Sequence, residues 1–338
     1  MDPDETWAFR GYLDAGELGL GYLISSLNPG QDCPRQSFYI NLLLPSDQGG
    51  MFRAPRALCV FERATGDPAW RHYDPASQTA VSKPEIELVV RHIPTIGNYD
   101  YVVDYVFQKR GNIKFRVGAT GLDAIRSVTS PDMASENAAR ETRFGALVAP
   151  YTVAPYHDHY VSYRLDLDVD GTNNVFIRDQ VEPRSLKKEH QRAGLWILRS
   201  EGKGTEGPIL KKPGAHGQVW RLSNQNKKTS LGHNPSYQIE PGHEVRSLLP
   251  NDDPLQARAA FAAHSLWLTA YNPNEKWSAG QYPNLSKPGQ GLPVYVSDQQ
   301  NIANTDIVAW YTMGFRHITR PEDFPILPTR WHEFQLRP

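Results

Sequence analysis

Apolar and polar residues alternate with a period of two in many short stretches of this chain. Ile113, Phe115 and Val117 alternate with Lys114 and Arg116, which is the pattern of a strand with one buried face. A longer alternation runs through residues 163–170 and is expected to end at Gly171. Shorter apolar runs of the same kind lie at residues 86–90, 195–198, 218–222, 266–268 and 307–310. The pattern therefore predicts a chain made mostly of β-strands.

Helical stretches are few and short. The best candidates are residues 135–143 and 255–263. The chain also holds 26 glycines and 27 prolines, about a sixth of its residues against the roughly 12% of an average protein, which favours many turns over long helices. These features predict an all-β fold, a large antiparallel β-sandwich with long loops and few short helices.

Length alone leaves the number of domains open, because 338 residues suit one large β domain or two smaller ones. Loops rich in Gly, Pro, Asn and Lys occupy residues 201–217, 223–238 and 272–292. Strand patterns of one kind lie on both sides of these loops, so we interpret them as long connections or hairpin arms. We predict a single domain over residues 1–338.

Charge and hydropathy argue against several classes of partner. The 36 basic and 37 acidic side chains give a formal charge of −1, which makes nucleic acid and anionic membranes poor partners. No apolar run reaches the roughly 18 residues that cross a bilayer. The acidic N-terminus has no apolar core of a signal peptide. We expect a soluble protein and leave its compartment open.

Two histidines are placed to share a metal ion. His157 and His159 are two positions apart, so on a strand both imidazoles leave the same face. Imidazole suits copper, zinc, nickel and iron. Among 11 histidines in the chain such a pair also arises by chance, and zinc is the ordinary occupant.

A group of carboxylates forms a second candidate site. Asp166 and Asp168 share a strand face, and Asp306 lies on a later strand. With backbone oxygens of Leu167 and Ile307 they would suit a hard cation such as Ca²⁺. The alternative is an ordinary solvated strand face.

The segment Thr95-Ile96-Gly97-Asn98-Tyr99-Asp100 gives the histidines a further meaning. It resembles the Thr-x-x-Asn-Tyr-(Asp/Glu) motif of the copper amine oxidases, whose tyrosine becomes trihydroxyphenylalanine quinone, or topaquinone, in the presence of copper and O₂. The segment from Gly314 to Pro325 resembles the part of that family that holds a distal copper histidine, here His317, although Thr319 stands where proline is usual. The resemblance implies copper on His157, His159 and His317, a quinone made from Tyr99, and an orienting role for Asn98. It also assigns the carboxylate group to a peripheral cation.

The resemblance extends to the N-terminal part of the chain. Gly11-Tyr12-Leu13-Asp14-Ala15-Gly16-Glu17 is similar to the family's Tyr-x-Asp-x-Gly-(Glu/Asp) segment. It implies that Asp14 is the base that takes the α-proton of the substrate, and that Tyr12 is a gate residue of the substrate channel. Taken alone, Asp14 would be a turn aspartate. Cys33 and Cys59 are either two buried thiols or a disulfide, and the resemblance favours the disulfide.

The resemblance therefore implies a supersandwich fold, a homodimer, and oxidation of a primary amine by O₂ to aldehyde, H₂O₂ and ammonia. Only about 11 residues precede the matching part, so the chain is a minimal form, a fragment, or an enzyme whose chemistry has drifted. Two alternatives stay open. One is a related copper enzyme that acts in biosynthesis on a larger molecule, and the other is a non-catalytic metal-binding sandwich. The sequence does not identify the amine.

Overall fold

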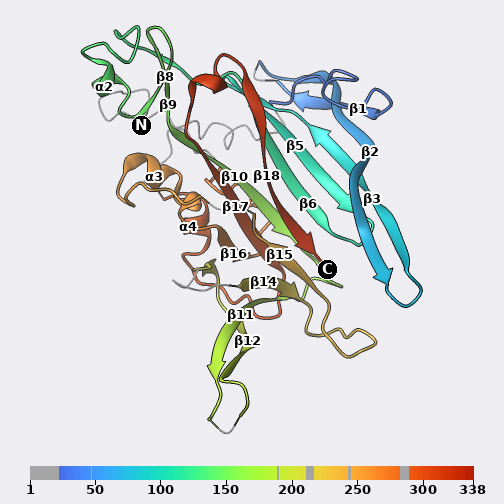
Figure 1. Ribbon diagram of the computed structural model, residues 1–338. Helices are drawn as coiled ribbons and strands as arrows, with labels where there is room; N and C mark the ends of the chain where they lie inside the picture. The colour runs from blue at the N-terminus through green and yellow to red at the C-terminus, as the bar shows by residue number, and fades with distance from the viewer. Residues whose placement is uncertain (1–22, 47, 189, 211–216, 243–244, 282–288) are drawn as a thin grey trace. The chain divides into compact units, whose positions relative to one another are not determined.

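The computed structural model describes residues 23–46, 48–188, 190–210, 217–242, 245–281 and 289–338 (Figure 1). The chain divides into two compact units. Unit 1 comprises Met1–His157 and Arg316–Gln335, and unit 2 comprises Asp158–Phe315 and Leu336–Pro338. No helix in these described ranges has the length and apolar character needed to cross a bilayer.

Unit 1 is built around antiparallel strands in the order β1-β2-β3-β5-β6-β18, with β4 paired to β5. These strands are β1 (Phe38–Pro45), β2 (Met51–Asp74), β3 (Thr79–His92), β4 (Thr95–Ile96), β5 (Tyr99–Gln108), β6 (Ile113–Gly121) and β18 (Leu327–Arg337), whose last residues belong to unit 2. A small sheet has the order β7-β9-β8. Its strands are β7 (Arg126–Ser127), β8 (Gly145–Ala149) and β9 (Thr152–Pro155). The unit also holds the helix α2 (Ala138–Glu141) and the 3₁₀ turn η3 (Pro321–Asp323).

Unit 2 contains two sets of strands, in the orders β10-β17-β16-β13 and β15-β14-β11-β12. The first set is β10 (His157–Asp166), β17 (Ile307–His317), β16 (Leu266–Ala270) and β13 (Gly207–Pro208). The first residue of β10 and the last two residues of β17 belong to unit 1. The second is β11 (Val175–Ser185), β12 (Gly194–Lys203), β14 (Gln218–Ser223) and β15 (Ser236–Glu240). Short helices are α3 (Pro254–Arg258), η2 (Ala260–Ala263) and α4 (Leu292–Tyr295).

The architecture confirms the predicted all-β class. The described chain has large antiparallel sheets, long loops and few helices, none longer than five residues. Both helix candidates are found in shortened form, as α2 and as α3 followed by η2. The strand predicted over residues 163–170 is too long, because β10 ends at Asp166. Beyond it the backbone turns, with Val169 N–H donating to Leu167 O and Asp170 at a φ of 51°.

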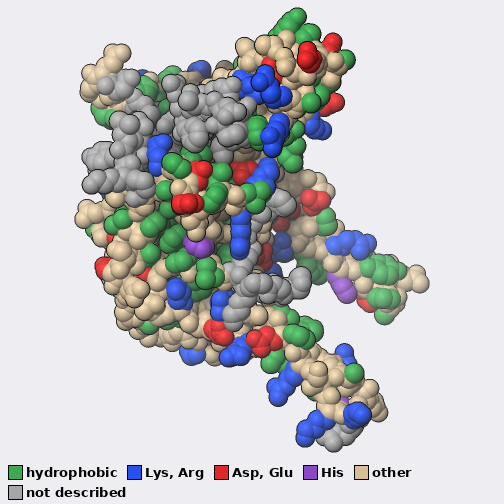
Figure 2. Space-filling model, turned by 90° about the vertical axis from the view of Figure 1, so that its left-hand side faces the viewer, with side chains coloured by type: hydrophobic (Ala, Val, Ile, Leu, Met, Phe, Trp, Pro, Cys, Tyr) green, Lys and Arg blue, Asp and Glu red, His purple; other side chains and the backbone are tan. Residues whose placement is uncertain are grey.

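The hairpin of β11 and β12 forms an arm that was not predicted, because its turn lies between Ser185 and Gly194, outside the three predicted loops. Its ten paired positions run from Phe176 opposite Lys203 to Ser185 opposite Gly194. Trp196 on β12 is 70% exposed, so this strand is not covered by the described chain. Lysine and arginine side chains gather at the tip, seen at the bottom of Figure 2.

A disulfide joins Cys33 to Cys59, as the family resemblance implied. Both cysteines are buried, and they pack with Leu27, Ile93 and Val102. The bridge spans a sequence separation of 26 residues. It therefore fastens the segment before β1 to the middle of β2.

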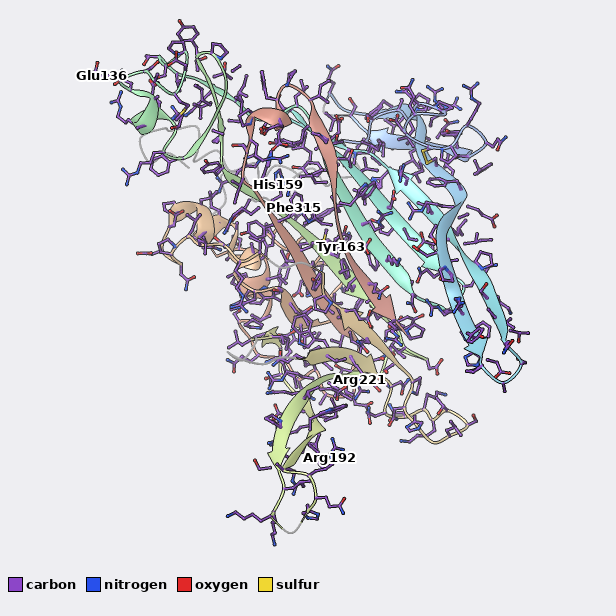
Figure 3. The ribbon with its side chains drawn as sticks, viewed as in Figure 1. Glu136, His159, Tyr163, Arg192, Arg221 and Phe315 are labelled. Carbon is purple, nitrogen blue, oxygen red and sulfur yellow. A yellow bond between two sulfur atoms is a disulfide. The ribbon has the colours of Figure 1, made fainter. Side chains whose placement is uncertain are left out.

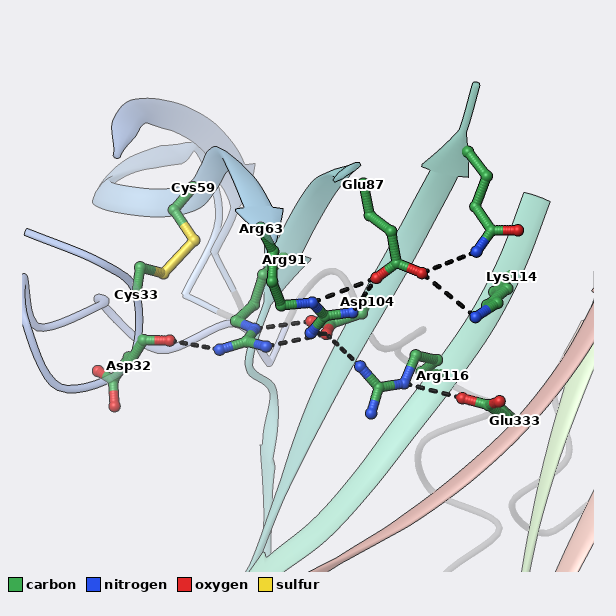
Figure 4. Close-up of polar contacts among 11 residues, drawn as sticks. Asp32, Cys33, Cys59, Arg63, Glu87, Arg91, Asp104, Lys114, Arg116 and Glu333 are labelled. Carbon is green, nitrogen blue, oxygen red and sulfur yellow. Dashed lines mark hydrogen bonds and ion pairs between the residues drawn. A yellow bond between two sulfur atoms is a disulfide. The ribbon is translucent and has the colours of Figure 1, made fainter. Parts of the chain in front are cut away.

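A buried ion network crosses β2, β3, β5 and β6 in unit 1 (Figure 4). The register places Arg91 opposite Asp104, and Asp104 opposite Arg116. Arg91 binds Asp104 through Nε at 2.6 Å and Nη2 at 2.8 Å, and the Asp104 side chain is fully buried. Burial opposes ionisation of the neighbouring Glu87, but hydrogen bonds from Arg63, Gln108 and Lys114 outweigh it and lower its pKa. Cross-strand pairs thus put charge inside the sheet.

His92, at the end of β3, gives a testable pH dependence. The side chain is buried, and burial lowers its pKa to about 4 despite the nearby charge of Asp104. In the unfolded chain His92 takes up a proton near pH 6.5, whereas in the folded chain it stays neutral at that pH. The free energy of unfolding therefore falls as the pH drops below about 6.5. We expect the free energy of unfolding to fall by about 2 kcal/mol from this residue between about pH 7 and about pH 5.

Urea unfolding of the protein and of His92→Gln at both pH values measures this effect. The substitution should remove that part of the acid sensitivity. An equal loss of stability in both proteins would assign the effect to other groups.

Candidate functional site

Tyr99 is held at the start of β5 by a two-residue turn. Thr95 and Ile96 of β4 pair with Asp100 and Tyr99, and the turn between them consists of Gly97 and Asn98. Gly97 has a φ of 60°, while Asn98 has an ordinary negative φ, which is the type II′ geometry that favours glycine at the first central position. Thr95 Oγ1 also donates to Asp100 Oδ1 at 2.5 Å. Several residues of the motif therefore build the turn that presents Tyr99.

The end of β6 and the residues that follow it contact the turn that presents Tyr99. Gly121 pairs with Tyr99 and has a φ of 106°, and a Cβ there would lie 2.5 Å from Asn98 O. Leu122 N–H donates to Asn98 O at 2.8 Å. The Asn98 side-chain amide donates to Asp123 O at 3.3 Å. Gly121 thus permits a close approach that brings Asp123 to Tyr99.

Four polar groups surround the Tyr99 hydroxyl, which is buried. Its oxygen lies 2.7 Å from Asp123 Oδ1, 2.9 Å from His157 Nε2 and 3.5 Å from His317 Nδ1. Ala124 N–H donates to it at 3.4 Å. Burial raises the pKa of Tyr99 above its ordinary value, and the hydrogen bond and charge of Asp123 raise it further. The free phenol is therefore held in its neutral form.

The two imidazoles are oriented by second hydrogen bonds. His157 Nδ1 lies 2.8 Å from Pro155 O. A carbonyl only accepts, so a neutral ring carries its proton on Nδ1 and turns the lone pair of Nε2 toward Tyr99. His317 Nε2 lies 3.4 Å from Asp323 Oδ2, which leaves the lone pair of Nδ1 for the same place. Such a carboxylate–histidine pair orients metal ligands.

Asp323 is itself fixed as an anion. It is buried, and Arg320 donates to its two oxygens at 2.9 and 3.3 Å. Hydrogen bonding from Arg320 lowers the pKa of Asp323. The carboxylate can therefore hold the ring of His317 over the whole neutral range.

His159 completes the histidine group that the sequence predicted. It follows His157 by two residues on β10, and its ring stacks on Phe315 with centroids 4.7 Å apart (Figure 3). One ring nitrogen from each of His157, His159 and His317 lies within 4.8 Å of the others. Three neutral imidazoles fit copper or zinc.

The fit to a metal ion has a second basis in the protons of the site. The single hydroxyl proton of Tyr99 faces two acceptors, Asp123 Oδ1 and His157 Nε2. One proton cannot serve both. A metal ion on the lone pair of Nε2 would remove this competition, so the donor set suits a cation next to the tyrosine oxygen.

Replacing Asp323 with Asn should weaken metal binding by about 10- to 100-fold, which is the usual effect of losing such a supporting carboxylate. The amide keeps the shape of the side chain but lacks the negative charge that holds the His317 ring. Competition with a chelator for Cu²⁺ measures the change. The neighbouring exposed Glu322, changed to Gln, is the matched control. Equal copper affinities of all three proteins would contradict the supporting role.

The acidic group predicted for a second cation is also assembled, within unit 2. Carboxylate oxygens of Asp166, Asp168 and Asp306 lie within 4.8 Å of one another. Burial raises the pKa of Asp306, and the charges of Asp166 and Asp168 raise it further. Arg164 pairs with Asp166 at 3.1 Å. Leu167 and Ile307 adjoin these residues in the chain.

Two predicted site residues, Tyr12 and Asp14, lie outside the described residues. Two others were not predicted. Asp123 and Asp323 contact Tyr99 and His317, and both are buried carboxylates. The only signal in the sequence was Asp323 within the segment that contains His317, and Asp123 follows a strand with no motif of its own.

Comparison with known proteins gives consistent results. A family model described as the copper amine oxidase enzyme domain matches residues 1–338. The peroxisomal copper-containing amine oxidase alpha 2 of Arabidopsis thaliana is 36% identical over 343 residues, covering 100% of this chain and 50% of that protein. The primary amine oxidase of Klebsiella aerogenes is 35% identical, covering 100% of this chain and 45% of that protein.

The fold has solved counterparts. A copper-containing benzylamine oxidase from Hansenula polymorpha superposes with a TM-score of 0.86 at 28% identity, over 96% of this chain and 50% of the other. The chain spans about half the length of the curated relatives it matches.

Proposed function

Because the chain belongs to the copper amine oxidase family, we propose that it oxidises a primary amine with O₂, using copper and a quinone that forms from Tyr99. The overall reaction converts the amine, O₂ and water into an aldehyde, H₂O₂ and ammonia. The amine loses two electrons and O₂ gains them, so no further reductant is needed.

One observation carries this proposal. The Tyr99 hydroxyl lies 2.9 Å from His157 Nε2 and 3.5 Å from His317 Nδ1. A metal ion held by these nitrogens would adjoin the ring that has to be oxidised. The nearest alternative is a structural zinc site, in which four protein ligands leave no open position. Such a site gives no reason for a buried tyrosine beside the ligands.

When bound, copper and the quinone supply a redox-active electrophile that condenses with an amine and that natural side chains lack. The chain's own residues would hold the copper ion and orient its ligands. His157, His159 and His317 would hold the copper ion. Asp323 fixes the ring of His317, and Pro155 O fixes the ring of His157.

The remaining roles rest on the family resemblance. We assign to Asp14 the removal of the proton from the α-carbon of the amine, for which a carboxylate with a pKa near the working pH serves best. Tyr12 is assigned as the gate of the substrate channel. Asn98 contributes by tying the segment that contains Asp123 to the start of β5, which supports the orientation of Tyr99.

The proposal includes three features of the assembled protein. We propose that residues 1–338 act as one catalytic domain, since β10, β17 and β18 each run unbroken from one unit into the other. We further propose a homodimer, and a calcium ion at Asp166, Asp168 and Asp306 with backbone oxygens of Leu167 and Ile307.

An oxidase assay tests the proposal. Metal-free protein is loaded with Cu²⁺ in air, and O₂ uptake and H₂O₂ release are followed with a panel of small primary amines. Zinc-loaded protein is the matched control, because zinc fills the same imidazole site but has no redox chemistry. Turnover in the copper form alone supports the proposal. If the protein binds copper but shows neither turnover nor a coloured adduct with a hydrazine, the proposal is contradicted and the non-catalytic sandwich is favoured.

The same assay separates the remaining alternative. If the copper-loaded protein forms the hydrazine adduct but turns over none of the small amines, oxidation of simple amines is contradicted. It would favour the related enzyme that acts on a larger molecule.

A further inference from the structure

Asp123 is a buried carboxylate at the centre of the site. Its side chain has no exposed surface, and its Oδ1 accepts from the Tyr99 hydroxyl at 2.7 Å. Oδ1 also lies 3.8 Å from His317 Nδ1. Within the part of the chain that the structure describes, Oδ2 has no hydrogen-bond partner. Burying a carboxylate is costly, so its position here calls for a physical reason.

The backbone around Asp123 is held by contacts that do not involve the Tyr99 side chain. Leu122 N–H donates to Asn98 O, and the Asn98 amide donates to Asp123 O. Gly121 allows this approach, because a side chain there would collide with Asn98 O at 2.5 Å. Two hydrogen bonds and the strand pairing of Gly121 with Tyr99 thus anchor the segment 121–123 on the turn that presents Tyr99. The Asp123 side chain therefore contacts the Tyr99 hydroxyl from a backbone that is held in place.

The bond to Asp123 gains importance once a metal ion is bound. The metal would occupy the lone pairs of His157 Nε2 and His317 Nδ1, and these nitrogens could then no longer accept the hydroxyl proton. Asp123 Oδ1, 2.7 Å from the Tyr99 hydroxyl, is an acceptor that would remain. A buried hydroxyl needs such an acceptor.

We propose that Asp123 is a positioning residue, which keeps the Tyr99 ring with its hydroxyl toward the imidazoles through a hydrogen bond. This inference rests on the proposed function, since it concerns the tyrosine that is to be oxidised. The ring can turn about its side-chain bonds, and the bond to Oδ1 favours the orientation that faces the metal. Small misplacements of a reacting group are costly, with a shift of about 1 Å worth roughly 100-fold in rate.

Two substitutions separate the hydrogen bond from the charge. Asp123→Asn removes the charge but keeps an acceptor oxygen at the same place. Asp123→Leu has the same branched shape, with larger methyl groups in place of the oxygens, and no acceptor. Glu141→Gln is the matched control, because Glu141 accepts from the hydroxyl of Thr129 at 2.7 Å and does not take part in the site.

The first measurement uses metal-free protein and needs no activity. NMR of protein labelled at the ring carbon that bears the hydroxyl resolves Tyr99, assigned by its loss in Tyr99→Phe. We expect the Tyr99 signal to move strongly in Asp123→Leu and less in Asp123→Asn, and to stay in place in Glu141→Gln. An unmoved Tyr99 signal in the folded Leu variant would overturn the proposal.

The second measurement follows oxidation of Tyr99 after Cu²⁺ is added in air, by the mass of its peptide. We expect Asp123→Leu to slow oxidation at least about tenfold, while Asp123→Asn retains at least about a third of the original rate. Equal rates in the Leu variant and the unchanged protein would overturn the positioning role. If Tyr99 of the unchanged protein is not oxidised, the proposed function fails, and the NMR measurement still decides whether Asp123 holds the hydroxyl.

Discussion

Tyr99→Phe is expected to abolish amine oxidation while copper still binds. The ring keeps its place at the start of β5, but phenylalanine has no ring oxygen from which the quinone can develop. We expect the rate to fall at least about 1000-fold, which corresponds to roughly 4 kcal/mol of lost transition-state stabilisation. The assay is H₂O₂ release by copper-loaded protein.

Copper affinity separates this effect from loss of the metal. Three imidazoles remain in the variant, so we expect affinity within about tenfold of the unchanged protein, measured against a chelator. Tyr105→Phe is the matched control, because Tyr105 is a tyrosine on the same strand whose ring packs against Phe115. Normal turnover by Tyr99→Phe would rule out a quinone made from this residue.

Asp104→Asn is expected to cause the largest loss of stability, about 3–5 kcal/mol of unfolding free energy. The Asp104 carboxylate is fully buried and pairs with Arg91 at 2.6 Å, with Arg63 and Arg116 at 3.8 Å. Removing its charge leaves guanidinium groups in the sheet without their shared anion. Urea unfolding at neutral pH measures the loss.

Glu333→Gln is the control for this prediction. Glu333 also pairs with Arg116, at 2.9 Å, but its side chain is 52% exposed. A pair of this kind contributes at most about 1 kcal/mol. If Asp104→Asn were as mild as Glu333→Gln, the buried network would not stabilise the fold.

Seven of the strands lie where the sequence predicted them, namely β3, β6, β10, β12, β14, β16 and β17, whereas others such as β2 and β18 were not predicted. Alternation located β6 from Ile113, Phe115 and Val117. It overran the end of β10, because Asp166 and Asp168 keep the alternating pattern through a turn that the backbone of Asp170 makes. In β17 nearly every residue is buried, so alternation is absent and only the first part was found, as an apolar run.

The ion network could not be predicted from the sequence. Asp104 lies within the apolar run of β5 and would be read as an interruption. Its partners are on other strands, and only the register places Arg91 and Arg116 opposite it. Charge patterns along one strand carry no information about register.

The candidate site divides in the same way. Local spacing or a motif was enough to identify His157, His159 and Tyr99, and the surrounding segment identified His317. Asp123 meets Tyr99 across 24 residues of chain, through a backbone approach that depends on Gly121. A carboxylate after a strand has no local signal for such a contact, so this partner of the tyrosine became visible only in three dimensions.

The mass of the peptide that contains Tyr99 tests the central claim most directly. The peptide is measured in metal-free protein, and again after Cu²⁺ is added in air. The account predicts an unmodified tyrosine before copper and added oxygen on Tyr99 afterwards, with a coloured adduct on treatment with a hydrazine. A Tyr99 that stays unmodified while copper is fully bound would contradict it.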